Sequence, residues 1–145
     1  MTFSRKVTVD WKGSVLEGSG EAKAGSGAFS LPVSFPRRVG DAQGVTSPEE
    51  LIAAAHATCY AMALNSTVGR KGGAIARTHI TCTVSADKGD TGIKITTSKL
   101  VVTVEGLTGI EPKAFAEVAQ AAEGACPVSN ALRGSLRIEL ETHVK

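Results

Sequence analysis

The sequence predicts a mixed α+β fold in which antiparallel sheets pack on one long central helix. Residues 47–70 form a long stretch that is rich in alanine and has no helix breaker before Gly69. Segments rich in β-branched residues lie on both sides of it in adjacent runs, which favours antiparallel pairing over alternation with helices. Because 145 residues suit one domain of ordinary size, we expect a single domain over residues 1–145.

The first third of the chain is predicted to consist of strands and turns. Its opening segment alternates in side-chain character, and the next segment carries four glycines, which favours two short strands or a meander. Pro32 and Pro36 interrupt the segment before the helix, which we expect to be extended and to lie at a sheet edge or on an irregular path. In order, these are a strand at 3–11, a turn at 12–13, the meander at 14–32, the extended segment at 31–39 and a polar loop at 40–46.

The central helix has a complete start signal, Ser47-Pro48-Glu49-Glu50. Ser47 can cap the helix, proline suits the first helical position, and Glu50 completes a capping box. One face of the helix carries mostly small side chains, so the backbone of another helix can approach it closely. We therefore expect Cys59 to be buried on this face in a helix–helix contact. That face comprises Leu51, Ile52, Ala55, Cys59, Met62 and Ala63.

The second half of the chain is predicted to add three strands and two short helices. Two alternating, β-branched segments separated by a turn favour a hairpin, and the C-terminal segment alternates cleanly. Glu111-Pro112 and Pro127 each provide a helix start, and Gly124 and Gly134 mark the two helix ends. The strands are expected at 74–87, 93–104 and 135–143.

The composition excludes several classes of function. A net charge of +2, with scattered lysines and arginines, gives no basic surface for nucleic acid or for an anionic membrane. No apolar run reaches about 18 residues, and the N-terminus has no apolar signal core, so we expect a cytoplasmic protein without a membrane span. No nucleotide-binding or metal-cofactor motif is present, and we therefore expect no cofactor.

The three cysteines are the candidate reactive groups. In a reducing compartment they do not suit a structural framework, and a bond between two of them would be transient and redox-active. Cys59 lies in the middle of the central helix, where a buried core residue and a reactive thiol are equally open interpretations. Cys126 directly precedes Pro127 and therefore occupies a helix cap, whereas Cys82 lies among threonines and valine and is interpreted as structural.

A set of short motifs follows in order along the chain. They are Val9-Asp10-Trp11-Lys12-Gly13, Phe35-x-x-Arg38, Pro48-Glu49-Glu50-Leu51, Ala54-Ala55-His56-Ala57-x-Cys59 and Gly124-Ala125-Cys126-Pro127-Val128-Ser129. Together they resemble the osmotically inducible protein and organic hydroperoxide resistance (OsmC/Ohr) family over essentially the whole chain. His56 is more similar to the OsmC branch than to the Ohr branch, where a tyrosine is usual.

The resemblance implies an OsmC-like fold and a thiol-dependent peroxidase of oxidative and osmotic stress defence. Such an enzyme would reduce organic hydroperoxides and, less well, hydrogen peroxide, and an external thiol of the dithiol or lipoyl type would reduce it again. Cys59 matches the peroxidatic cysteine and Cys126 the resolving cysteine, which closes an intramolecular disulfide. Glu49 and an arginine match the residues that hold the thiolate. Arg38 fits the Phe-x-x-Arg spacing and Arg37 the spacing to the next glycine, so both stay candidates.

Helix geometry adds a prediction about assembly. Along one continuous helix Glu49 and Cys59 are about 15 Å apart and point roughly 80° away from each other. Either the helix breaks early, or Glu49 and the arginine serve the Cys59 of a second subunit whose helix runs antiparallel. The helix face with small side chains suits such close packing. We therefore predict an intertwined homodimer with composite active sites.

The alanine-lined surroundings of Cys59 give a prediction about the substrate. They favour an organic hydroperoxide over hydrogen peroxide.

Two other functions remain open from the sequence. His56 and Cys59, at i and i+3 on a helix, could form a metal site with Cys126. His79 and Cys82 repeat this spacing, but on a strand their side chains point to opposite faces and cannot share a metal. The protein could also be a non-catalytic small-ligand domain in which the cysteines are only core residues. His56 itself is interpreted as a packing or hydrogen-bonding residue near the pocket.

Overall fold

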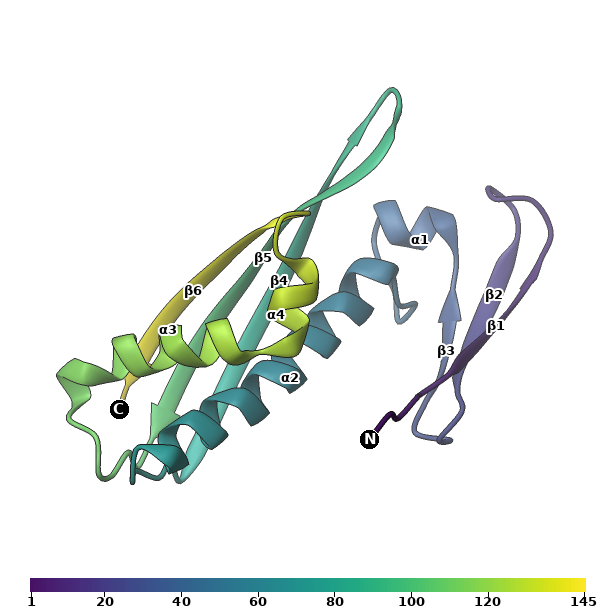
Figure 1. Ribbon diagram of the computed structural model, residues 1–145. Coiled ribbons are helices and arrows are strands. Elements are labelled where there is room, and N and C mark those ends of the chain that lie inside the picture. Colours follow the sequence, from purple (N-terminus) through teal and green to yellow (C-terminus); the bar gives the residue numbers. More distant parts are fainter. The chain divides into compact units, whose positions relative to one another are not determined.

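The computed structural model describes all residues from Met1 to Lys145, and their contacts divide the chain into two compact units. The first unit comprises Met1–Leu51 and the second Ile52–Lys145. Each unit contains one three-stranded sheet, and Figure 1 shows the strands and helices of both. The mixed α+β class predicted from the sequence is confirmed.

The first unit is a meander of three strands followed by one short helix. Strand β1 (Val7–Lys12) pairs antiparallel with β2 (Ser19–Ala24), which pairs antiparallel with β3 (Ser30–Val33). Gly13 follows β1 with a φ of +88°, a conformation that glycine adopts without steric cost, so it can open the turn. The prediction of two short strands or a meander over residues 14–32 is confirmed by β2 and β3.

The segment before the long helix differs from its prediction. The sequence predicts an extended path throughout residues 31–39, but the second half of this segment forms helix α1 (Phe35–Val39). Pro36 lies in the first turn of this helix, where its fixed φ suits the helix and its missing N–H costs no hydrogen bond. The helix ends at Gly40, whose N–H donates to the carbonyl of Pro36 at 3.0 Å. The expectation of an extended path was therefore wrong from Phe35 onward.

Helix α2 (Pro48–Arg70) is the long helix that the sequence predicts, and it is unbroken over 23 residues. The hydroxyl oxygen of Ser47 accepts the backbone N–H of Glu50 at 3.1 Å, as the start signal predicts. The Glu50 carboxylate, however, accepts the hydroxyl of Thr46 at 2.8 Å. Neither α2 nor any other helix is long and apolar enough to cross a membrane.

The sheet of the second unit contains one antiparallel and one parallel pair. Strand β4 (Arg77–Gly89) forms the predicted hairpin with β5 (Gly92–Glu105), and β6 (Arg137–Val144) adds to β5. This last pair is parallel, so the expectation of antiparallel pairing throughout was wrong there. The chain between β5 and β6 is long enough to cross back over the sheet and bring β6 in along the same direction. This crossover comprises η1 (Pro112–Ala114), α3 (Phe115–Ala125) and α4 (Pro127–Leu132).

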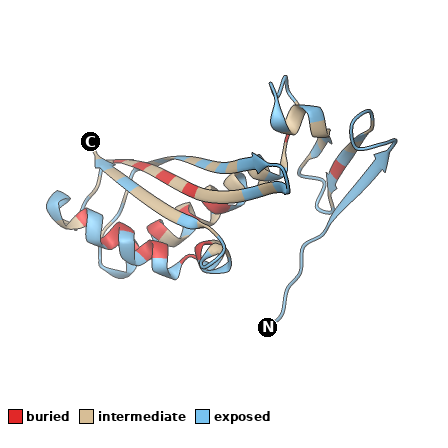
Figure 2. Cartoon of the chain, turned by 90° about the horizontal axis from the view of Figure 1, so that it is seen from above, coloured by how far each residue is buried: buried red, intermediate tan, exposed pale blue.

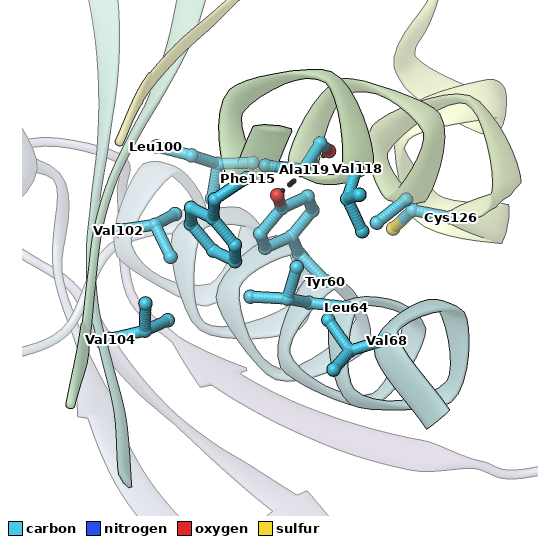
Figure 3. Close-up of a cluster of buried hydrophobic side chains, with 11 residues drawn as sticks. Tyr60, Leu64, Val68, Leu100, Val102, Val104, Phe115, Val118, Ala119 and Cys126 are labelled. Carbon is cyan, nitrogen blue, oxygen red and sulfur yellow. Dashed lines mark hydrogen bonds between the residues drawn. The ribbon is translucent and has the colours of Figure 1, made fainter. Parts of the chain in front are cut away.

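The hydrophobic core of the second unit lies where α2 and α3 pack on strand β5. In Figure 2 the buried residues of this unit form bands along one strand of the sheet and on the helices beside it, and Figure 3 shows the side chains of the core cluster. The Tyr60 hydroxyl donates to the carbonyl of Ala119 at 2.9 Å, which satisfies its polar atom inside the core. The cluster comprises Tyr60, Leu64, Val68, Leu100, Val102, Val104, Phe115, Val118, Ala119, Ala122 and Cys126.

The buried face of α2 is not the face that the sequence analysis selected. Within this chain Ala55 is exposed and Met62 is 64% exposed, so the small face is not the one that meets the core. The core instead takes the larger side chains, which recur mainly every four residues and fill the space against β5 and α3. They are His56, Tyr60, Leu64, Thr67 and Val68. Cys59 lies at the margin between the two faces and is half-buried.

Neighbouring positions on β5 provide a test of this packing. Leu100 is completely buried beneath the helices, whereas Val101 points to the opposite face and is only half-buried. We expect Leu100→Ala to lower the free energy of unfolding by about 2–4 kcal/mol, because it leaves a cavity in the core. Val101→Ala should cost less than about half as much. Urea unfolding at one fixed protein concentration measures both, and equal losses would contradict the register described here.

Candidate active site

Two free thiols lie together at one end of the core of the second unit. Cys59 is carried by α2, and Cys126 lies at the junction of α3 and α4, where it is completely buried. The Cys126 thiol is a hydrogen-bonding neighbour of the Cys59 thiol. Two cysteines that are far apart in the sequence are therefore brought into contact.

Cys59 opens onto a pocket of about 350 Å³. Most of its wall is small or apolar, which agrees with the alanine-lined surroundings expected for this thiol. The cation at this pocket, Arg70, lies eleven residues further along α2 and donates to the hydroxyls of Ser66 at 3.1 Å and Thr67 at 3.2 Å. The lining residues are Cys59, Met62, Ala63, Ser66, Arg70, Ala125 and Pro127.

The first turn of α4 holds both sulfur atoms. Cys126 is the N-cap of this helix, as predicted, and its Sγ accepts the backbone N–H of Ser129 at 3.5 Å. The next N–H towards the N-terminus, that of Val128, is a hydrogen-bond donor to the Cys59 thiol. Proline at position 127 starts the helix and so directs these two N–H groups towards the sulfur atoms.

The Cys59 thiol is not activated by its own surroundings. Burial raises its pKa above the ordinary value, and the neighbouring Cys126 thiol raises the pKa further, while the N–H of Val128 lowers it. A thiol with a raised pKa is largely protonated at neutral pH, and the thiolate is the nucleophile. A peroxidatic Cys59 therefore needs a cation within hydrogen-bonding reach.

An arginine–glutamate pair is the other feature that the sequence analysis anticipated. Arg38 Nε donates to the two carboxylate oxygens of Glu49 at 3.1 and 3.2 Å, and Arg38 Nη2 donates to Oε1 at 2.7 Å. The two side chains are 27% and 14% exposed. The pair raises the pKa of Arg38 and lowers the pKa of Glu49, mainly through these hydrogen bonds. Arg37 instead donates to the backbone carbonyl of Asp41 at 3.2 Å, in an exposed position.

The pair borders an apolar pocket of the first unit. This pocket has a volume of about 450 Å³, and Arg38 is its only charged lining residue. All three strands of the sheet contribute side chains to the wall of this pocket, and so does the first turn of α2. The lining residues are Val9, Trp11, Val15, Ala22, Val33, Ser34, Phe35, Arg38, Thr46, Pro48 and Leu51.

Helix α2 decides between the two explanations for the spacing of Glu49 and Cys59. It does not break between them, so the two residues are separated by ten residues of continuous helix, or about 15 Å along its axis. An early break of the helix was one way in which Glu49 could have reached the Cys59 of its own helix. That explanation is excluded.

His56 is held in a buried hydrogen-bond network, which agrees with its interpretation as a packing or hydrogen-bonding residue, although its partners could not be identified from the sequence. It is completely buried, and its ring nitrogens contact two serine hydroxyls: Nδ1 lies 2.7 Å from Ser98 Oγ and Nε2 lies 2.8 Å from Ser129 Oγ. Burial lowers the pKa of His56, and the Glu123 carboxylate opposes this shift. No spacing rule could have found the network, because its members lie on α2, β5 and α4.

This network leaves no ligand set for the metal site considered above. Both nitrogens of His56 are occupied by serines, and His, Cys, Asp and Glu side chains form no group of three or more that could hold a metal ion. On strand β4, His79 is exposed while Cys82 faces the core, so the two point to opposite faces as predicted. Cys82 Sγ lies 3.3 Å from Ser98 Oγ, and burial raises the pKa of its thiol.

The lowered pKa of His56 gives a prediction about stability. Between the folded-state pKa and the unfolded value of 6.5, the unfolded chain binds the proton that the folded protein excludes. The stabilising contribution of neutral His56 is therefore complete above pH 6.5 and is lost as the pH falls below it. The polar and titratable groups around the ring are the Ser98 and Ser129 hydroxyls and the Glu123 carboxylate. The Cys82 thiol lies beside Ser98, and the Cys126 thiol lies beside Ser129.

Unfolding in urea under reducing conditions, from pH 7.5 to pH 5, measures this contribution. The side chain introduced by His56→Gln does not titrate. As the pH falls, we therefore expect the free energy of unfolding to decrease more steeply in the wild type than in His56→Gln, by up to about 1.4 kcal/mol for each pH unit. All other titrating groups are common to both proteins and cancel in the difference. Parallel pH profiles for the two proteins would contradict the prediction.

Comparison with known proteins agrees with this architecture. The sequence model of the OsmC-like protein family matches residues 40–141. Peroxiredoxin OsmC of Escherichia coli is 35% identical over 97% of this chain and 98% of its own, and the organic hydroperoxide resistance protein OhrA of Bacillus subtilis is 33% identical over 78% and 79%. The crystal structure of the organic hydroperoxide resistance protein OhrB of Bacillus subtilis superposes with a TM-score of 0.76, at 29% identity over 97% and 98% of the two chains. The chain therefore belongs to the OsmC-like family.

Proposed function

We propose that the protein is a cysteine-based peroxidase that reduces organic hydroperoxides through Cys59 and Cys126. The observation that carries the proposal is the contact between two free thiols, one of which lines a pocket. One of them, Cys59, is accessible from that pocket, and the other is completely buried behind it. Membership of the OsmC-like family and the names of the relatives support a role in peroxide resistance.

The reaction proceeds in three balanced steps. The Cys59 thiol loses its proton, and the thiolate attacks the terminal oxygen of the hydroperoxide. The O–O bond breaks, the alkoxide leaves and takes up that proton as an alcohol, and Cys59 becomes a sulfenic acid. The Cys126 thiol then attacks the Cys59 sulfur, the S–O bond breaks and water leaves, which closes the disulfide. An external dithiol finally reduces this disulfide by thiol–disulfide exchange and becomes a disulfide itself.

The Arg38–Glu49 pair supplies the cation that Cys59 needs. A guanidinium stays charged at any cellular pH, and its fork can donate to Glu49 and to a thiolate at the same time. Because the helix between Glu49 and Cys59 is continuous, we assign the pair to the Cys59 of a second copy of the chain. Arg37, bound to a backbone carbonyl in an exposed position, has no such role.

Two features of the chain support a homodimer in which both units form one OsmC-like domain. Ala22 is the only apolar residue of the first unit that is fully buried, while many of its other apolar side chains stay exposed. Such a unit has too little core to be stable unless another surface covers it. Met62, beside the Cys59 pocket, is exposed as well. The exposed apolar residues of the first unit are Met1, Phe3, Val7, Val9, Trp11, Val15, Leu16 and Val39.

Mass spectrometry before and after one equivalent of cumene hydroperoxide tests the reaction. We expect a loss of about two mass units, mapped to a Cys59–Cys126 disulfide, because disulfide formation removes two hydrogens. Cys82→Ser should show the same loss, and Cys59→Ser should not. An unchanged mass, or three added oxygens on a cysteine, would contradict the mechanism. Faster turnover with hydrogen peroxide than with cumene hydroperoxide would contradict the substrate preference alone.

Complementation between two inactive variants tests the composite site. In a co-expressed mixture of Cys59→Ser and Arg38→Met, a mixed dimer has one site with both functional groups if each site combines two chains. Random pairing then returns about a quarter of the wild-type activity. If each site lies within one chain, no site in the mixture is complete, and the activity stays at the level of the separate variants. Full activity in a monomeric fraction would also exclude the composite site.

A further inference from the structure

The short helix α4 carries the sulfur contacts but cannot hold its own position. It has six residues, which is too short for a helix to be stable without tertiary contacts. Near the surface, the Asn130 side chain donates to the carbonyl of Gly124 at 3.1 Å, and Arg133 donates to Glu123 at 2.6 Å. Both of these donors are substantially exposed. The position of α4 over the core therefore depends on contacts made by its buried face.

The buried polar contact of α4 runs through His56 to the sheet. The Ser129 hydroxyl lies 2.8 Å from Nε2 of His56, and Nδ1 of the same ring lies 2.7 Å from the hydroxyl of Ser98 on β5. All three residues are completely buried. An imidazole that is hydrogen-bonded through both nitrogens holds its partners in place. Breaking either hydrogen bond would leave a buried polar atom unpaired, which costs free energy.

The same serine connects this network to the resolving thiol. The hydroxyl of Ser129 faces His56, while the backbone N–H of Ser129 donates to Cys126 Sγ at 3.5 Å. His56 also lies one turn before Cys59 on α2. One end of the network is thus fixed to the helix that carries the first thiol, and the other end to the turn that carries the second.

We propose that His56 is a positioning residue for disulfide formation: through Ser129 it clamps the first turn of α4 and so holds Cys126 beside Cys59. The proposal rests on the peroxidase function proposed above. It assigns a role to a buried, titratable side chain that takes no part in the reaction with the peroxide. Displacement of a reacting group by about 1 Å can slow a reaction 100-fold, so a loosened α4 should slow the second step in particular.

Amide replacements of His56 separate its two contacts. The glutamine amide of His56→Gln reaches the position of Nε2 and can bond Ser129, whereas the shorter amide of His56→Asn reaches only the position of Nδ1 beside Ser98. Ser129→Ala removes the same contact as His56→Asn but leaves the ring in place. Asn130→Ala, at the next position on α4, removes a surface anchor and serves as the matched control.

Rapid mixing with cumene hydroperoxide, followed by trapping of the sulfenic acid with dimedone, measures the two steps separately. We expect the disulfide-forming step to slow about tenfold or more in His56→Asn and in Ser129→Ala. The first step should change less than about threefold in both. His56→Gln and Asn130→Ala should stay within about threefold of the wild type in both steps, and His56→Asn and Ser129→Ala should accumulate the dimedone adduct on Cys59.

Three results would overturn the proposal. They are an unchanged disulfide-forming step in Ser129→Ala, an equal loss of both steps in every His56 variant, and an equal slowing in Asn130→Ala. Thermal melting of each variant shows whether it is folded. If the His56 variants fail to fold, Ser129→Ala still tests the proposal, because it removes only one buried oxygen. Failure of the peroxidase function itself is recognised separately, because the wild type would then form no disulfide.

Discussion

Replacing Cys59 with serine should abolish hydroperoxide reduction, with a fall in kcat/KM of about 10³-fold or more. A serine hydroxyl does not ionise near neutral pH and is a poor nucleophile towards the O–O bond, so no other group at the pocket replaces the thiolate. Steady-state turnover of cumene hydroperoxide with an excess of a dithiol reductant measures the loss. Cys59 is half-buried beside the core, and the exchange of sulfur for oxygen changes its volume little, so the variant should stay folded.

Cys82→Ser is the matched control for this experiment. Cys82 faces the core from β4 and contacts Ser98, but it does not line the pocket at Cys59. Its replacement should leave kcat/KM within about twofold of the wild type. If Cys59→Ser kept its activity while Cys82→Ser lost it, the peroxidatic thiol would be misassigned. If neither variant changed and the wild type were inactive as well, a non-catalytic binding domain would be favoured.

Replacing Arg38 with lysine should lower kcat/KM by about 10²-fold, although the positive charge is kept. The guanidinium of Arg38 makes three hydrogen bonds to Glu49 through two nitrogens, and a lysine ammonium cannot reproduce that fork while also reaching a thiolate. Loss of a positioned donor at a reacting centre commonly costs between 10² and 10³ in rate. Steady-state kinetics and the rate of thiol alkylation at Cys59 together measure the loss of turnover and of thiolate.

Arg37→Lys decides which of the two adjacent arginines acts. Arg37 contacts only the backbone carbonyl of Asp41 among the hydrogen bonds of its side chain, and lysine can replace that contact. We expect its kcat/KM to stay within about twofold of the wild type. The opposite ranking, in which Arg37→Lys is the slower enzyme, would move the activating role from Arg38 to Arg37.

The parts of the fold that were predicted correctly from the sequence depend on local signals. The start of α2 follows from Ser47 and Pro48, and the hairpin of β4 and β5 follows from two alternating segments joined by a short turn. Proline at position 127 predicts that Cys126 caps a helix, and the sulfur of Cys126 accepts the Ser129 N–H as a cap does. Each of these features is determined within a few residues.

The parts that were missed depend on competition or on distance. Pro36 suits both an irregular extended path and the first turn of a helix, and only the structure shows that the helix forms. The parallel pairing of β6 depends on how the crossover returns, which no residue of β6 encodes. The contact partners of His56 are 42 and 73 residues away, so its two hydrogen bonds could not be anticipated from its neighbours.

The buried face of α2 was missed for a different reason. Small residues at helical spacing drew attention to the face with Cys59, while the larger residues of the true core face recur at a similar spacing on the same helix. Periodicity alone cannot rank two such faces. Side-chain volume could have ranked them, because Tyr60 and Leu64 fill more core space than alanines do.

The contact between Cys59 and Cys126 closes a loop of roughly 70 residues. A covalent bond at this contact would restrict the unfolded chain, and for a loop of that length this restriction stabilises the folded state by about 4 kcal/mol. The linkage works in both directions, so folding lowers the reduction potential of the bond by about 90 mV relative to the same bond in an unfolded chain. The reductant must therefore have a lower reduction potential than it would need to reduce the same disulfide in an unfolded chain. A dithiol, which closes a ring of its own as it is oxidised, meets this demand better than a monothiol does.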